Sequence, residues 1–200
     1  MGLVMILAAV GGVAWLAFRV AVDPAVPRAA TSAVDSQRAQ QKILSIVSGS
    51  ARGRQVVLSE AELNAFLERN LVEAADVNVT DLRVDLGNPD AVRLAGKTTL
   101  GALLAEPPFA AIRDVVPGAW LARPAWIELV AKPTMETVRG RRRYLRLDVH
   151  EMRIGRQRVP ALFAKLLLEP GAARLLRWPL PPSVEDVTIE PGRAVVRTAS

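Results

Sequence analysis

The chain has 200 residues, half of them hydrophobic, and a formal net charge of +6, which suits one domain with an appendage. It contains no cysteine, so disulfides, thiolate metal sites and cysteine nucleophiles are excluded. His150 is the only histidine, which leaves little from which to build a two-histidine metal site or a histidine-based catalytic triad.

The first predicted element is a membrane anchor over residues 1–22. No charged residue occurs from Gly2 to Phe18, and Arg19 follows near the end of the apolar run. Twenty helical residues span about 30 Å, the thickness of the hydrocarbon core of a bilayer. A cleaved signal peptide and a buried helix are the competing interpretations. A signal peptide requires a basic leader and a small-x-small cleavage site, and neither is clear here.

The flanking charges bear on the orientation of this anchor. Arg19, Arg28 and Arg38 follow the apolar run, and no Lys or Arg precedes it. Under the positive-inside rule this pattern places the following domain in the cytoplasm. The leader is only two residues long, so we give this argument little weight.

Residues 23–55 are predicted to form a tether and a short helix. The stretch 23–34 contains two prolines and several small residues, as tethers do. A helix is predicted over 35–49 with Asp35 or Ser36 as its N-cap and Gly49 as its stop. Its expected apolar face consists of Ile43, Leu44 and Val47.

The stretch LSEAELNAFL, residues 58–67, carries a strong helix-start signal. Ser59 and Glu62 have the spacing of a capping box, and Leu58 and Leu63 have that of a hydrophobic staple. A helix over 59–72 then has an apolar face of Leu63, Phe66, Leu67, Asn70 and Leu71, opposite Glu60, Glu68 and Arg69. We expect the apolar face to lie on an apolar surface.

From Val77 onward the apolar residues alternate, which predicts antiparallel strands. In VNVTDLRVDL the alternation shifts by one residue near Thr80, as it does at a β-bulge. Further strands are predicted after the turn at 87–90, in a hairpin around 139–143, and on both sides of a turn at 190–193. A helix is predicted over 160–178, with Pro160 in its first turn and an interruption by EPG at 169–171.

Residues 100–126 combine four prolines with many apolar side chains. The prolines exclude one long helix and a central strand. One interpretation is a short packing helix over 108–116. The other is that the segment lines an apolar groove or enters a membrane interface, with Trp120 and Trp126 at the boundary.

The sequence RGRRRYLRL, which begins at Arg139, is the densest basic cluster. This pattern indicates either a solvated hairpin tip or a site at which Arg141, Arg142 and Arg143 contact anionic lipid head groups. Nucleic-acid binding is the weakest interpretation, because no aromatic platform or recognition helix accompanies the cluster. We therefore expect no nucleic-acid partner.

The chain resembles the YpmS-like and LmeA-like group of small bacterial envelope proteins. The resemblance lies in the apolar N-terminal anchor and in four stretches, namely VVLSEAELNAFL at 56–67, the strand pair at 81–96, LRLDVHEMRIGRQRVPALFAKLL at 145–167, and LPPSVEDVTIEPGRAVVR at 180–197. It implies a fold related to the tubular lipid-binding domains, in which a long helix is cradled in a highly curved antiparallel sheet around an apolar groove. It brings no catalytic residues.

The predicted fold class is therefore α+β. A transmembrane helix precedes a domain over 56–200, in which a highly curved antiparallel sheet packs against one longer and one or two shorter helices. The residues expected to line the groove are Leu63, Phe66, Leu67, Leu104, Phe109, Ile112, Trp120, Trp126 and Phe163.

We expect a non-enzymatic module that binds or handles lipid in the bacterial cell envelope. Residues 3–22 would hold it in the inner membrane as a single-pass protein, with a periplasmic domain and a phospholipid or other acyl ligand. The alternative is a structural partner that docks on another envelope protein through an exposed apolar segment. No nucleotide-binding or nucleophile motif is present, so no catalytic, cofactor or metal residues are predicted. An enzyme would need a cleft with perturbed carboxylates around Asp148 or Glu151.

Overall fold

The fold is α+β, as the sequence predicts. The computed structural model describes residues 30–74, 79–105, 110–113, 116–138, 142–161, 164 and 176–199. Its helices are α2 (Ala33–Val47), α3 (Glu60–Ala74), α4 (Leu100–Leu103), α5 (Ala110–Arg113) and α6 (Gly118–Leu121). Its strands are β1 (Gln55–Ser59), β2 (Thr80–Asp85), β3 (Val92–Thr99), β4 (Pro124–Val138), β5 (Arg142–Ile154), β6 (Gln157–Val159), β7 (Arg177–Pro179), β8 (Val184–Glu190) and β9 (Arg193–Thr198).

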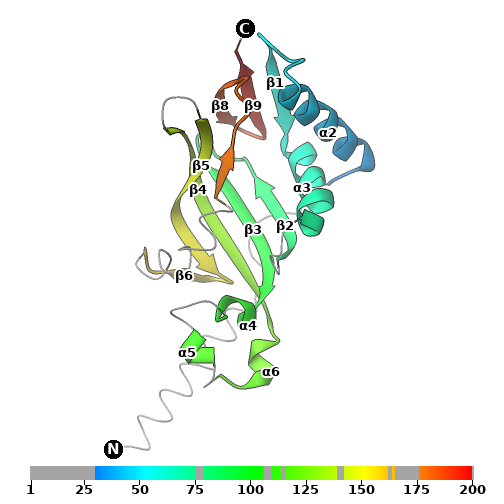
Figure 1. The fold of residues 1–200 in the computed structure, drawn as a ribbon. Helices are drawn as coiled ribbons and strands as arrows, with labels where there is room; N and C mark the ends of the chain where they lie inside the picture. Colours follow the sequence, from blue (N-terminus) through cyan, green and yellow to red (C-terminus); the bar gives the residue numbers. More distant parts are fainter. Residues whose placement is uncertain are drawn as a thin grey trace, which may run out of the picture.

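The strands form two antiparallel sheets. The larger, curved sheet has the order β2-β3-β4-β5-β6, and β7 also pairs with β5 (Figure 1). The smaller sheet has the order β1-β9-β8. Two helices of 15 residues, α2 and α3, lie beside β1 and β2, while the one-turn helices α4, α5 and α6 lie at the opposite end of the larger sheet (Figure 1).

Several predictions about the strands are confirmed. The pairing of β2 with β3 is irregular between Thr80 and Arg83, and Asp81 has a φ of 51°, so the predicted shift near Thr80 is a real break in the ladder. The β4–β5 and β8–β9 hairpins form where they are expected. Strand β1 is an addition, because residues 55–59 pair with β9 at the far end of the chain.

The predicted membrane anchor lies outside the described residues, as does most of the tether. Among the helices of the part that the structure describes, none combines the length and the apolar character needed to cross a bilayer.

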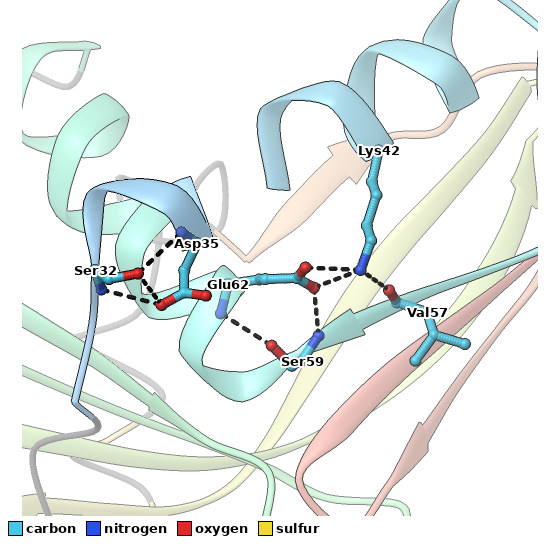
Figure 2. Close-up of polar contacts among 6 residues, drawn as sticks. All are labelled: Ser32, Asp35, Lys42, Val57, Ser59 and Glu62. Atoms are coloured by element: carbon cyan, nitrogen blue, oxygen red, sulfur yellow. Dashed lines mark hydrogen bonds and ion pairs between the residues drawn. The ribbon is translucent and has the colours of Figure 1, made fainter. Parts of the chain in front are cut away.

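The first helix starts earlier than predicted, and a different face of it is buried. Its N-cap is Ser32 rather than Asp35 or Ser36, and Asp35 closes a capping box with Ser32 (Figure 2). The buried residues are Ser36, Ala39 and Ile46, whereas the side chains of Leu44 and Val47 are 58% and 61% exposed. The prediction of the apolar face was therefore wrong for these two, because the buried face of α2 is the one that carries Ser36, Ala39 and Ile46.

The second helix begins as the capping box predicts. The amide of Glu62 donates to Ser59 Oγ at 3.2 Å, and the amide of Ser59 donates to Glu62 Oε2 at 2.9 Å (Figure 2). Lys42 of α2 joins this cap, because its Nζ lies 2.7 Å from each carboxylate oxygen of Glu62 and donates to the carbonyl oxygen of Val57. One ammonium group thus ties α2 to α3 and β1.

This ion pair makes the stability of the fold dependent on pH. Burial alone would raise the pKa of Glu62, but the hydrogen bonds from Lys42 and Ser59 outweigh it and hold that pKa below its ordinary value. A carboxyl group with a lowered pKa contributes stability that is complete above its ordinary pKa and is lost as the pH falls through the folded-state value.

We therefore expect the free energy of unfolding to fall on acidification below about pH 4.5, and to fall less in Glu62→Gln. Urea denaturation between neutral pH and the onset of acid unfolding measures both slopes. Since Glu151 also has a lowered pKa and is present in both proteins, only the difference between the slopes reports on Glu62. Equal slopes would contradict the expectation.

Helix α3 also covers the outer edge of β2. The side chain of Asn64 donates from Nδ2 to the carbonyl of Val84 at 2.7 Å, and Oδ1 accepts from the amide of Val84 at 2.8 Å. Glu60 Oε2 accepts a hydrogen bond from the amide of Leu86 at 2.8 Å. The prediction placed Glu60 on the face opposite the apolar side chains, but the structure places its carboxylate against the backbone that follows β2. Side chains thus take the place of a neighbouring strand at this edge.

The core lies where the two sheets and the two long helices meet. One cluster joins Val84, Leu86 and Val92 of the larger sheet region to Ile189 and Ala194 of the smaller sheet. Leu63 and Leu67 of α3 pack against this cluster, as the predicted apolar face requires. A second cluster joins the end of α2 to the smaller sheet through Ile46, Ala51, Val56, Val184 and Val196.

Candidate functional site

The outer edge of β5 is interrupted by a notch. Strand β7 pairs with residues 144–146 of this edge, and β6 pairs with residues 152–154. Between them, residues 147–151 pair with neither strand, although the amide of Leu147 donates to the carbonyl of Leu176 at 2.8 Å. A pocket of about 870 Å³ opens at this notch. Its size falls within the range of sites for small ligands.

A bulge in β5 shapes the notch. Val130 of β4 faces Glu151, whereas the next residue, Ala131, faces Val149, so His150 is an extra residue without a partner on β4. Such a bulge bends a strand and changes the direction of its side chains. His150 also lines the pocket, where its side chain is exposed.

Apolar side chains form much of the pocket wall. They come from β5, from β6, from the helical turn that begins at Pro160, and from the residue before β7. These residues are Leu147, Val149, Met152, Val159, Ala164 and Leu176. Leu147, Met152 and Ala164 are buried, so this part of the wall continues into the interior of the protein.

Three ion pairs stand around this apolar wall. Arg146 Nε lies 2.8 Å from Asp148 Oδ1, Arg158 Nη2 lies 3.7 Å from Glu151 Oε2, and Arg177 Nε lies 3.2 Å from Glu136 Oε2. All six side chains line the pocket, and we call them the charged rim. The guanidinium of Arg177 also stacks on the ring of Tyr144, 4.1 Å from its centroid.

The electrostatics of Glu151 favour its ionised form. The hydrogen bond from Arg153 Nε, 2.7 Å long, holds the pKa of Glu151 below its ordinary value, and the charges of Arg153 and Arg158 add to this effect against partial burial. A general acid at neutral pH needs a raised pKa. The arrangement around Glu151 therefore does not suit a general acid.

The residues predicted for the groove lie in several parts of the fold. Leu63 and Leu67 pack on the core, and Trp126 is buried on β4 beneath the guanidinium of Arg83, which lies 4.6 Å from the ring centroid. Phe66, Leu104 and Trp120 are half-buried, and the first of these belongs to α3. None of these six lines the pocket. The side chain of Ile112, in α5, and the residues Phe109 and Phe163 lie outside the described part.

The three arginines predicted to contact lipid head groups differ in their surroundings. Arg142 is exposed at the start of β5. Arg143 is half-buried and donates from Nη1 to the carbonyl of Val184 at 2.7 Å, so it fastens the hairpin to β8. Arg141 lies outside the described residues.

The predictions on two longer segments can be compared with the structure in part. The segment 100–126 contains the three short helices α4, α5 and α6 and then enters β4. Helix α5 lies within the packing helix predicted over 108–116, of which residues 108, 109, 114 and 115 lie outside the described residues and Val116 is not helical. Of the helix predicted over 160–178, the structure describes a turn in which the amide of Ala164 donates to the carbonyl of Pro160 at 2.9 Å. Its predicted end was wrong, because Arg177 and Trp178 pair with β5 as strand β7.

A comparison of the chain with protein-family models, with curated proteins and with solved structures finds no match.

Proposed function

We propose that this chain is a membrane-anchored, non-enzymatic module of the bacterial cell envelope that binds a lipid in the β5 pocket. Its apolar N-terminal run would hold it in the inner membrane, with the folded domain on the periplasmic side. The observation that carries the proposal is a pocket of lipid-compatible size whose wall is apolar and whose rim is charged. An acyl chain would lie on the wall, and the polar head group would meet the charged rim.

The supporting argument is the chemistry of the two surfaces together. Burial of an acyl chain against the apolar wall gains about 25 cal/mol for each Å² of apolar surface removed from water. A fully polar ligand would leave that wall without a partner, and a pure hydrocarbon would leave the rim charges unused. An amphiphile satisfies both.

A photoactivatable phospholipid tests this function in the full-length protein. The protein is reconstituted in vesicles that contain a trace of phospholipid with a diazirine near the end of one acyl chain. After irradiation, labelled tryptic peptides are identified by mass spectrometry. We expect label on Leu147–Arg153, the peptide that forms the β5 side of the pocket.

A matched pair of variants makes the experiment specific. Ala161→Arg places a long charged side chain at the pocket, and because Ala161 is exposed the fold should tolerate it. We expect labelling of Leu147–Arg153 to fall about tenfold, a loss of about 1.4 kcal/mol. Ala119→Arg, on the exposed surface of α6, should leave it unchanged. No label on Leu147–Arg153, or equal label in both variants, would contradict the proposal.

A further inference from the structure

The charged rim is electrically balanced although the chain is basic. Arginines 146, 158 and 177 oppose Glu136, Asp148 and Glu151, so that the charges cancel, in a chain whose net charge is +6. Each arginine already lies within 4 Å of a carboxylate of the same rim. The balance holds for the six charged side chains that line the pocket; Arg153, outside the lining, also donates to Glu151.

A balanced rim discriminates between head groups. An anionic head group that approached an arginine would come close to the carboxylate paired with it, and this like-charge contact opposes binding. A head group with both charges avoids the conflict, because its phosphate faces a guanidinium while its cation faces a carboxylate. Every rim charge then keeps an opposite partner when the ligand enters.

The rim also distinguishes between two kinds of cationic group. Quaternary ammonium groups are recognised mainly by aromatic side chains. The guanidinium of Arg177 already stacks on the neighbouring ring of Tyr144, and a quaternary ammonium has no N–H group with which to bond the carboxylates of the rim. A primary ammonium, in contrast, donates hydrogen bonds, which the carboxylates of Glu136, Asp148 and Glu151 can accept.

The positions of the charges fit this assignment. In two of the three pairs the arginine is the more exposed partner, because the side chains of Arg158 and Arg146 are 71% and 57% exposed and those of Glu151 and Asp148 are 22% and 36% exposed. In the third pair, the side chains of Arg177 and Glu136 are 39% and 41% exposed. The long side chains of Arg158 and Arg146 can therefore turn toward a phosphate at the entrance, while Glu151 and Asp148 remain on β5.

We propose, on the basis of the lipid-binding function above, that the β5 pocket selects amphiphiles whose head group joins a phosphate ester to a primary ammonium. It takes these in preference to choline-type head groups and to head groups with a net negative charge.

Three photoactivatable probes with the same acyl chains test the selection in the full-length protein. They carry ethanolamine, choline or glycerol on the phosphate, and each is present as a trace in identical host vesicles. We expect label on Leu147–Arg153 to be several-fold stronger with the ethanolamine probe than with either of the others. Stronger or equal labelling by the glycerol probe overturns the proposal, and equal labelling by the choline probe overturns its primary-ammonium part.

Variants show whether the rim sets the preference. Glu136→Gln leaves Arg177 without its carboxylate partner and gives the rim a net positive charge, so the ratio of glycerol-probe to ethanolamine-probe labelling should rise several-fold. Glu185→Gln removes an exposed carboxylate of β8 outside the pocket lining and should leave the ratio unchanged. Equal ratios in the two variants would overturn the role of the rim.

Competition with a soluble head group distinguishes a lipid from a free phosphate ester as the occupant of the pocket. Soluble glycerophosphoethanolamine in excess should not reduce labelling if the acyl chain on the apolar wall is needed, whereas complete competition would overturn a lipid as the occupant. Failure of selectivity and failure of the proposed function remain distinct. Equal labelling of Leu147–Arg153 by all three probes removes only the selectivity, and absence of label from all three removes lipid binding itself.

Discussion

Asn64→Ala is expected to lower the free energy of unfolding by about 2–4 kcal/mol. The side-chain amide of Asn64 bonds to both backbone groups of Val84 and also donates to the carbonyl of Glu60 at 2.9 Å. Asn64 and Val84 are buried, so alanine leaves the amide and the carbonyl of Val84 without partners in the interior. Each unsatisfied buried group costs about 1–3 kcal/mol. Equilibrium urea denaturation measures the loss.

Two further variants separate this mechanism from a general weakening of α3. Arg69→Ala, at an exposed position on the same helix, should change the stability by no more than about 0.5 kcal/mol. Asn64→Asp keeps an acceptor for the amide of Val84, but at neutral pH its carboxylate faces the carbonyl oxygens of Val84 and Glu60. It should destabilise at least as much as alanine at neutral pH, and less at acidic pH. A small effect of Asn64→Ala would show that water or β2 itself satisfies Val84.

The contact of Asn64 also protects the end of the larger sheet. Strand β2 is the outermost strand on that side, and an outer strand with free backbone groups invites pairing with another chain. The amide of Asn64 imitates a peptide group of a neighbouring strand. The sequence placed Asn64 between apolar positions without indicating this role, because its partner Val84 lies 20 residues away on another element.

The features that were predicted correctly depend on short-range patterns. The capping box of Ser59 and Glu62 joins residues three positions apart, and the shift near Thr80 is visible within one strand. Hairpins such as β4–β5 join neighbouring segments. In each case the residues that specify the geometry are close in sequence, so local periodicity is sufficient.

The errors on α2 and β1 have a different origin. The prediction for α2 assigned Ile43, Leu44 and Val47 to the interior. The buried face instead includes Ser36 and Ala39, whose small side chains give no apolar signal in the sequence. Strand β1 pairs with residues 193–197, which are far away in the chain. The sequence of β1 itself does not indicate such a partner.

The pocket combines contacts between distant segments with one feature that a local sequence pattern indicates. Its ion pairs Glu136–Arg177 and Glu151–Arg158 join separate strands, so the pattern within one strand does not reveal them. One local signal was available. The buried residues Leu147 and Met152 of β5 are an odd number of positions apart, which is the same kind of shift that indicated the irregularity near Thr80. Applied at His150, it predicts the bulge that shapes the notch.

Lys42→Met is the second substitution with a large expected effect. It removes the ammonium group that contacts both carboxylate oxygens of Glu62 and the carbonyl of Val57. The side chain of Glu62 is only 7% exposed, so its charge would remain in a mostly apolar setting with the amide of Ser59 as its remaining described donor. Loss of one partner of a fully buried pair costs about 3–5 kcal/mol. Because the side chain of Lys42 is 37% exposed and water screens it, we expect about 2–3 kcal/mol.

A double-mutant cycle tests the cause. Glu62→Gln keeps an acceptor for the amide of Ser59 and removes the charge, so the double variant with Lys42→Met should be more stable than the sum of the single losses predicts, by about 1 kcal/mol. Arg38→Met, at an exposed position on α2, serves as the control and should have little effect. Additive losses would mean that Lys42 acts through its packing or through Val57 alone. Coupling would show that the Lys42–Glu62 ion pair holds α2 against the domain that carries the pocket. Helix α2 is the helix that follows the predicted anchor.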